Sequence, residues 1–138
     1  MSERVFLDSN LLVYANDARD PAKQKRAAEL IAQHIREGTG VVSTQVLQEY
    51  ASVALTKLKQ EDAAILRVLR LLETLAVVGM TPALIRRAVE LRRIYGVSFW
   101  DAGILAAAEE GDCATLLSED FNSGQYYGGL RVQNPFLG

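Results

Sequence analysis

Four carboxylates, those of Asp8, Glu49, Asp101 and Asp120, are the side chains of this sequence that could together bind a metal ion and support catalysis. Oxygen-only ligands suit a hard divalent cation such as Mg²⁺ or Mn²⁺, whereas zinc and softer metals prefer His or Cys. Crowded carboxylates also repel one another, so a bound cation relieves that repulsion and gains affinity from it. The set therefore predicts a metal-binding acidic pocket, if the fold brings the four residues together.

The elements expected to position these acids alternate between strands and helices. Apolar runs predict strands at residues 5–7, 41–43, 75–79 and 114–117, and a fifth at residues 130–132 on the edge of the sheet. Helical spacing and capping residues predict helices after residue 8 and over residues 21–38, 44–58, 61–75, 82–95 and 98–111. This alternation predicts a three-layer α/β/α sandwich around a mainly parallel sheet of four to five strands, in one domain over residues 1–138.

A parallel sheet would gather the acids at one edge. Asp8 ends the first expected strand and Asp120 follows the fourth. Asp101 stands in the first turn of a helix, and Glu49 stands about one turn inside the helix that leaves the second strand. Because parallel strands share a carboxyl edge, where open α/β sheets bind ligands, the four side chains are expected at one site.

Each acid also has an ordinary structural explanation. Ser98 and Asp101 have the spacing of a helix capping box, and the other three acids fit a turn, an exposed helix position and a loop. Carboxylates next to apolar residues, however, usually need a partner. Such residues flank three of the four acids: Phe6 and Leu7, Phe99 and Trp100, and Phe121.

Taken in order, these motifs resemble the PIN domain family, at the size of VapC-type toxins, the ribonuclease halves of toxin–antitoxin pairs. The resemblance covers essentially the whole chain and rests on Asp8-Ser9-Asn10, Glu49, Asp101 and Ser118-Glu119-Asp120-Phe121. It implies an Mg²⁺- or Mn²⁺-dependent endoribonuclease in which a metal-activated water attacks the phosphodiester. The implied ligands are Asp8, Glu49, Asp101 and Asp120, with Asn10 and Ser118 supporting them through hydrogen bonds. Asn122 departs from the family pattern, since many members carry a further aspartate there, and this could weaken a second metal site.

The resemblance also implies a small antitoxin protein whose C-terminal segment wraps the toxin and places a basic residue in the pocket. The two middle helices carry more leucine than one sheet face needs, which predicts a homodimer or an antitoxin-binding groove on Leu55, Leu58, Leu66, Leu69, Leu72 and Leu75. Arg86 and Arg93 share a helix face that would guide RNA, although pairing with Glu90 into a solvated surface is the stronger expectation.

Overall composition narrows the class of protein without naming a substrate. The net charge is only −2, and the sequence holds one cysteine, Cys113, and one histidine, His34. We expect Cys113 in the core and His34 within a helix far from the strand ends, which argues against Cys-His and histidine acid–base chemistry. With no secretion signal or long apolar run, the expected location is the cytoplasm.

Two alternatives stay open. A metal-dependent phosphatase of the haloacid dehalogenase type would need a second aspartate where Asn10 stands. A non-catalytic PIN-like scaffold or RNA-binding module would be expected to lack one of the four acids, and its only support is Asn122.

Overall fold

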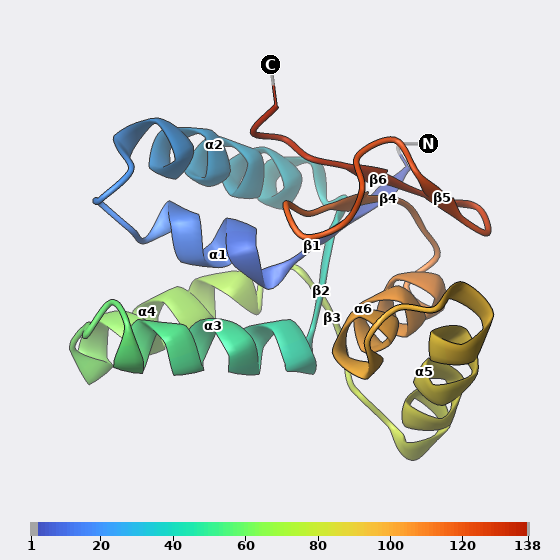
Figure 1. Cartoon of the computed structure of the whole chain (residues 1–138). Coiled ribbons are helices and arrows are strands. Elements are labelled where there is room, and N and C mark those ends of the chain that lie inside the picture. Colours follow the sequence, from blue (N-terminus) through green and yellow to red (C-terminus); the bar gives the residue numbers. More distant parts are fainter. Residues whose placement is uncertain (1–2, 138) are drawn as a thin grey trace.

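A computed structural model describes residues 3–137 of the chain, so residues 1, 2 and 138 of the expected domain lie outside it. The strands are β1 (Arg4–Leu7), β2 (Gly40–Ser43), β3 (Ala76–Val78), β4 (Cys113–Leu117), β5 (Tyr126–Tyr127) and β6 (Leu130–Gln133) (Figure 1). The helices are α1 (Ser9–Ala15), α2 (Pro21–Glu37), α3 (Thr44–Thr56), α4 (Asp62–Leu72), α5 (Pro82–Tyr95) and α6 (Phe99–Glu110).

The strands form one sheet in the order β3-β2-β1-β4-β6-β5. Every neighbouring pair is parallel except β5 and β6, which are antiparallel. The expected α/β fold with a mainly parallel sheet is confirmed. The expected strand count was too low, and β6 was wrongly placed at the edge, because the two-residue strand β5 pairs outside it.

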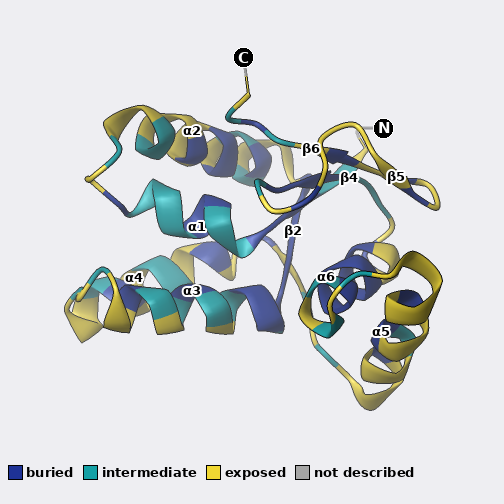
Figure 2. Cartoon of the chain, viewed as in Figure 1, coloured by how far each residue is buried: buried dark blue, intermediate teal, exposed yellow. Residues whose placement is uncertain are grey.

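Helices cover the sheet on both faces. Figure 1 shows α2 on one side of the central strands and α5 with α6 on the other. The helix α1 lies against both α2 and α3, and α4 packs on α3. Burial is deepest in the centre, where every residue of β2 is buried and α6 is buried over seven consecutive residues, 102–108 (Figure 2). The sheet therefore has a closed interior and presents only its ends to a ligand.

Helix ends follow the capping signals in the sequence. Gly38 and Gly96 close α2 and α5 with φ angles of 68° and 67°, a left-handed conformation that favours glycine. The helix α4 is shorter than expected and stops at Leu72. Leu72 and Leu75 both enter the core, so the apolar surface expected on the middle helices is smaller than predicted. Leu55 and Leu66 are exposed, as that expectation requires.

None of the helices in residues 3–137 has the length and apolar character needed to span a lipid bilayer.

Candidate acidic site at the carboxyl edge of the sheet

Asp8 lies at the junction of β1 and α1 and is held on both sides of its carboxylate. Its Oδ1 accepts a hydrogen bond from the Ser9 backbone N–H (2.7 Å) and caps α1. Its Oδ2 accepts one from the Ser118 hydroxyl (2.7 Å), directly after β4. Only 4% of Asp8 is exposed. The carboxylate of Asp8 is thus buried and held in one orientation at the carboxyl ends of β1 and β4.

Asn10 and Ser118 connect Asp8 to Asp120. The Asn10 side-chain amide lies 3.3 Å from both the Ser118 hydroxyl and Asp120 Oδ2, as their hydrogen-bond donor. Its carbonyl oxygen accepts from the Glu119 backbone N–H (3.3 Å). The Ser118 hydroxyl, which donates to Asp8, accepts from the Asp120 N–H (3.1 Å). Asn10 and Ser118, the two residues expected to support the site, therefore hold Asp8 and Asp120 in place relative to each other.

Glu49 comes to the site from the second turn of α3. Its Oε1 is buried and has no hydrogen-bond partner among the described residues. Burial raises the pKa of Glu49 to about 7, with further contributions from Asp8, Asp101 and Asp120, while nearby Gln45 partly offsets the shift. A buried carboxylate oxygen without a donor is costly. Glu49 is thus the acid with the clearest need for a cation.

Asp101 stands in the first turn of α6, where its backbone N–H donates to Ser98 Oγ (3.1 Å). The capping interpretation is correct for the backbone. Burial raises the pKa of the Asp101 carboxyl, a side-chain hydrogen bond with Ser98 opposes that shift, and the charge of Asp120 adds to it. Ser98 thus positions Asp101 at the start of α6.

The four acids act on one another electrostatically. Burial raises the pKa of Asp8 to about 6, and Asp120 and Asp101 add to the shift although the Ser118 and Ser9 hydrogen bonds oppose it. Asp8, Asp101 and Asp120 all raise the pKa of Glu49, and Asp120 also raises that of Asp101. Such mutual repulsion is the signature of carboxylates gathered at a ligand site.

A divalent cation fits this donor set by its chemistry. All the donors are oxygens, and Glu49 Oε1 lacks a partner among the described residues. Within residues 3–137, no three acidic, His or Cys side chains converge closely enough to form a ready-made metal cage. Side-chain rotation at one or more of the acids would therefore accompany cation binding.

The histidine and the cysteine lie away from the acids. His34 is buried in α2, with Nδ1 2.7 Å from the hydroxyl of Thr39, which precedes β2 and so stands at the opposite edge of the sheet. Cys113 is only partly buried, rather than fully in the core as expected, and burial raises the pKa of its thiol to about 12. Neither group is placed to assist the acids.

The expected salt-bridged face on α5 exists with a different arginine. Glu90 pairs with Arg87 (3.5 Å), which also pairs with Glu109 of α6 (2.9 Å). The pairing of Glu90 with Arg86 and Arg93 that the helix spacing predicts is therefore wrong. Both of those arginines are exposed and make no salt bridge within the described part of the chain, so they stay available to solvent.

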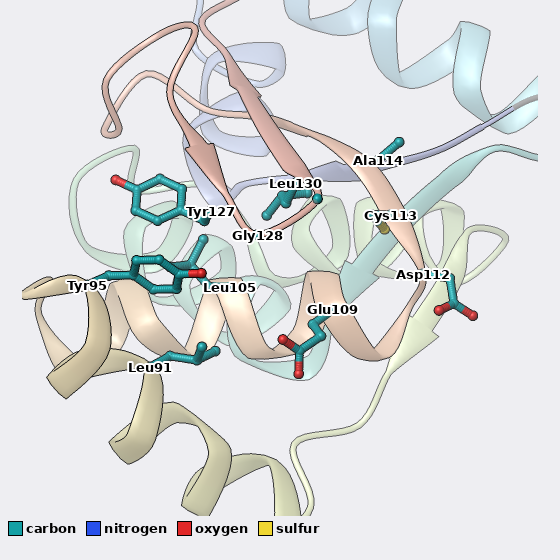
Figure 3. Close-up of a pocket in the computed structure, with 11 residues that line it drawn as sticks. Leu91, Tyr95, Leu105, Glu109, Asp112, Cys113, Ala114, Tyr127, Gly128 and Leu130 are labelled. Carbon is teal, nitrogen blue, oxygen red and sulfur yellow. The ribbon is translucent and has the colours of Figure 1, made fainter.

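A cavity of about 390 Å³ lies between α5, α6 and the β5–β6 hairpin. Figure 3 shows Tyr95 and Tyr127 at one end and Asp112 and Cys113 at the other. The two tyrosine rings meet edge to face, with centroids 5.1 Å apart. Tyr127 also meets Phe121 edge to face at 5.8 Å. This aromatic series attaches the residue after Asp120 to α5, a positioning role that sequence reasoning missed.

Comparisons with known proteins identify a family and solved structures that are similar to this chain. The family model of the PIN domain matches residues 5–127. No curated protein matches the sequence. The chain is similar to the crystal structure of VapC20 from Mycobacterium tuberculosis, a sarcin-ricin loop cleaving toxin (TM-score 0.67, 21% identity, covering 84% of this chain and 91% of that one).

Two further solved structures have the same fold. One is a toxin–antitoxin complex from Klebsiella pneumoniae (TM-score 0.69, 21% identity, 96% of this chain and 98% of that one). The other is VapBC2 from Rickettsia felis, bound to a DNA fragment from its promoter (TM-score 0.68, 19% identity, 94% and 97%).

Proposed function

Since the chain belongs to the PIN domain family, we propose that it is a metal-dependent endoribonuclease that hydrolyses phosphodiesters in single-stranded or looped RNA. The observation that supports this best is the group of four mutually repelling acids at the carboxyl edge of the sheet. Asp8, Glu49, Asp101 and Asp120 are the proposed ligands of Mg²⁺ or Mn²⁺. A bound cation would acidify the attacking water and stabilise charge on the scissile phosphate.

The acids would have different roles in holding the cation. Asp8 and Asp120 are held at fixed separation by Asn10 and Ser118, so they supply the rigid part of the site. Glu49 has a free buried oxygen and supplies the part that adapts. Water-driven hydrolysis needs no 2′-hydroxyl nucleophile, so the expected products carry 5′-phosphate and 3′-hydroxyl ends.

We also propose that the protein is the toxin of a toxin–antitoxin pair and works in the cytoplasm. Its partner would be a small antitoxin protein. An apolar groove of about 360 Å³ between α2 and α4, lined in part by Ile31, Ile35, Val68 and Leu71, is the proposed contact surface, and of the leucines expected to form such a groove only Leu72 lines it. A homodimer is the second proposed assembly. Light scattering of the isolated chain at micromolar concentration would disprove the homodimer if it showed only monomer.

The nuclease proposal is tested with labelled single-stranded and hairpin RNA. Wild type is expected to cut in Mg²⁺ or Mn²⁺ and to stop in EDTA. Asp8→Asn is expected to abolish cutting, and Glu110→Gln at the exposed end of α6 is the matched control for loss of a charge. If wild type and Asp8→Asn behave alike across metals and RNAs, the nuclease proposal is wrong and a binding scaffold replaces it.

A further inference from the structure

Trp100 is an exposed aromatic residue at the start of α6. It directly precedes Asp101 in α6, and 65% of it is exposed. It is also the only tryptophan of the chain. Its ring meets Phe99 edge to face, with centroids 5.2 Å apart. A large aromatic surface left in water next to a charged site is more typical of ligand contact than of packing.

The backbone under Trp100 is fixed by a buried residue from another helix. Gln45 of α3 donates a hydrogen bond from Nε2 to the Trp100 carbonyl oxygen (2.9 Å). Gln45 stands one helical turn before Glu49 and acts on that carboxylate as well. The same side chain therefore ties the start of α6 to the acid-bearing turn of α3, so Trp100 has a defined position relative to the acids.

A cavity of about 430 Å³ opens at Trp100. Its lining combines apolar walls with polar groups, and includes Met80, Ile85, Phe99, Trp100, Thr44 and Gln48. Gln48 is exposed, and its side chain makes no hydrogen bond to any described residue. Pockets of this size that mix apolar walls with a few polar groups suit small planar ligands.

We propose that Trp100 and this cavity form a nucleobase platform, on which an unpaired base next to the scissile phosphate stacks. The inference rests on the proposed nuclease function and adds a substrate-binding residue to it. Stacking on an aromatic ring suits any base, and recognition of splayed-out RNA bases uses such surfaces together with amide groups at the base edge. Gln48 is the amide placed for that second role.

The test uses the fluorescence of Trp100 itself, in EDTA, so that binding is measured without cleavage. Short single-stranded RNA is expected to quench the tryptophan emission in a saturable way. An abasic oligomer of equal length and charge is expected to leave the emission unchanged, because it has the phosphates but no base to stack. Equal quenching by both oligomers would overturn the proposal.

Substitutions test the platform by an independent binding measurement, such as polarisation of labelled RNA. Trp100→Ala is expected to weaken RNA binding roughly 5- to 150-fold, while Trp100→Phe stays within about fivefold of wild type. Tyr126→Ala, at an exposed aromatic residue of β5, is the matched control and should bind as wild type does. Wild-type affinity in a folded Trp100→Ala variant would overturn the proposal.

The outcomes separate this inference from the nuclease proposal. Metal-dependent cleavage together with unquenched Trp100 emission would leave the nuclease intact and remove the platform. If the Trp100 emission changed with protein concentration but not with RNA, the surface at Trp100 would be assigned to contact with a second copy of the chain. That result would also overturn the platform proposal. RNA-dependent quenching without cleavage would support the platform and contradict the nuclease.

Discussion

Lys23 of α2 donates a hydrogen bond to Glu119 across 2.6 Å, joining residues 96 positions apart. Tyr14 donates to the other oxygen of Glu119 (2.7 Å), and Lys23 also lies 4.6 Å from the centre of the Tyr14 ring. Glu119 directly precedes Asp120. Lys23 and Tyr14 therefore hold the side chain of Glu119, while Asn10 holds its backbone, and together they fix the loop that presents Asp120.

Loss of the hydrogen bonds from Lys23 and Tyr14 to Glu119 should slow cleavage without weakening RNA binding. We expect Glu119→Ala to lower kcat roughly tenfold, less than the ~100-fold that a misplacement of about 1 Å can cost, with little change in KM. Glu119→Gln should recover part of the rate because its amide oxygen still accepts from Lys23. Steady-state kinetics on a single RNA substrate would measure both values. A change confined to KM would show that Glu119 contacts RNA rather than positions Asp120.

Stability in EDTA should fall as pH rises through the range in which Asp8 ionises. The folded-state pKa of Asp8 is about 6, above its ordinary value of 3.8, so the folded protein keeps a proton that the unfolded chain releases. The stability that the folded protein gains by keeping this proton on Asp8 is fully present below about pH 4 and is lost as pH rises through about 6. A shift of this size corresponds to ~3 kcal/mol. Asp8→Asn should therefore gain stability relative to wild type between pH 4 and pH 8.

Urea unfolding across that pH range would measure the difference. Glu110→Gln, exposed at the end of α6, is the control for a general change in net charge and should follow wild type. Parallel profiles for wild type and Asp8→Asn would contradict the assignment of a buried, partly protonated acid at position 8.

Divalent cations should stabilise the fold more at pH 8 than at pH 5.5. Carboxylates must be ionised to bind a cation, and Glu49, with a pKa of about 7, is largely protonated at the lower pH. At a cation concentration 100 times Kd, the expected gain is about 2.7 kcal/mol, seen as a rise in Tm that EDTA reverses. Glu49→Gln should reduce the gain at pH 8. An equal effect of Mg²⁺ on both proteins would place the cation elsewhere.

Replacing Gly103 of α6 by alanine should destabilise the fold. A Cβ at this position would collide with Oε1 of Gln45, the residue that holds the Trp100 carbonyl oxygen. We expect Gly103→Ala to cost about 1–3 kcal/mol of unfolding free energy and to shift the Trp100 emission. Gly129→Ala is the matched control, because a Cβ there meets open space. Equal stability of the two variants would show that Gln45 moves aside freely.

The sequence predicted the acids more fully than the groups that hold them. Asp8 directly follows an apolar run and Asp120 comes shortly after another, and the shared end of parallel strands brings such residues together whatever their separation in the chain. Glu49 and Asp101 were placed from helix spacing alone. By contrast, nothing local marks Lys23 as the partner of Glu119, or Gln45 as the support of Trp100, because each contact joins distant elements. The strand β5 was missed because two residues in a polar, glycine-rich stretch form no recognisable pattern.

The hydrogen bond from Ser118 to Asp8 spans 110 residues, nearly the whole chain. A ribosome adds about 5–20 residues per second, so Ser118 is made on the order of 5–20 s after Asp8. During that interval the growing chain has the first strand but neither β4 nor the loop with Asp120. The acidic pocket therefore cannot assemble until the chain has been made as far as Asp120.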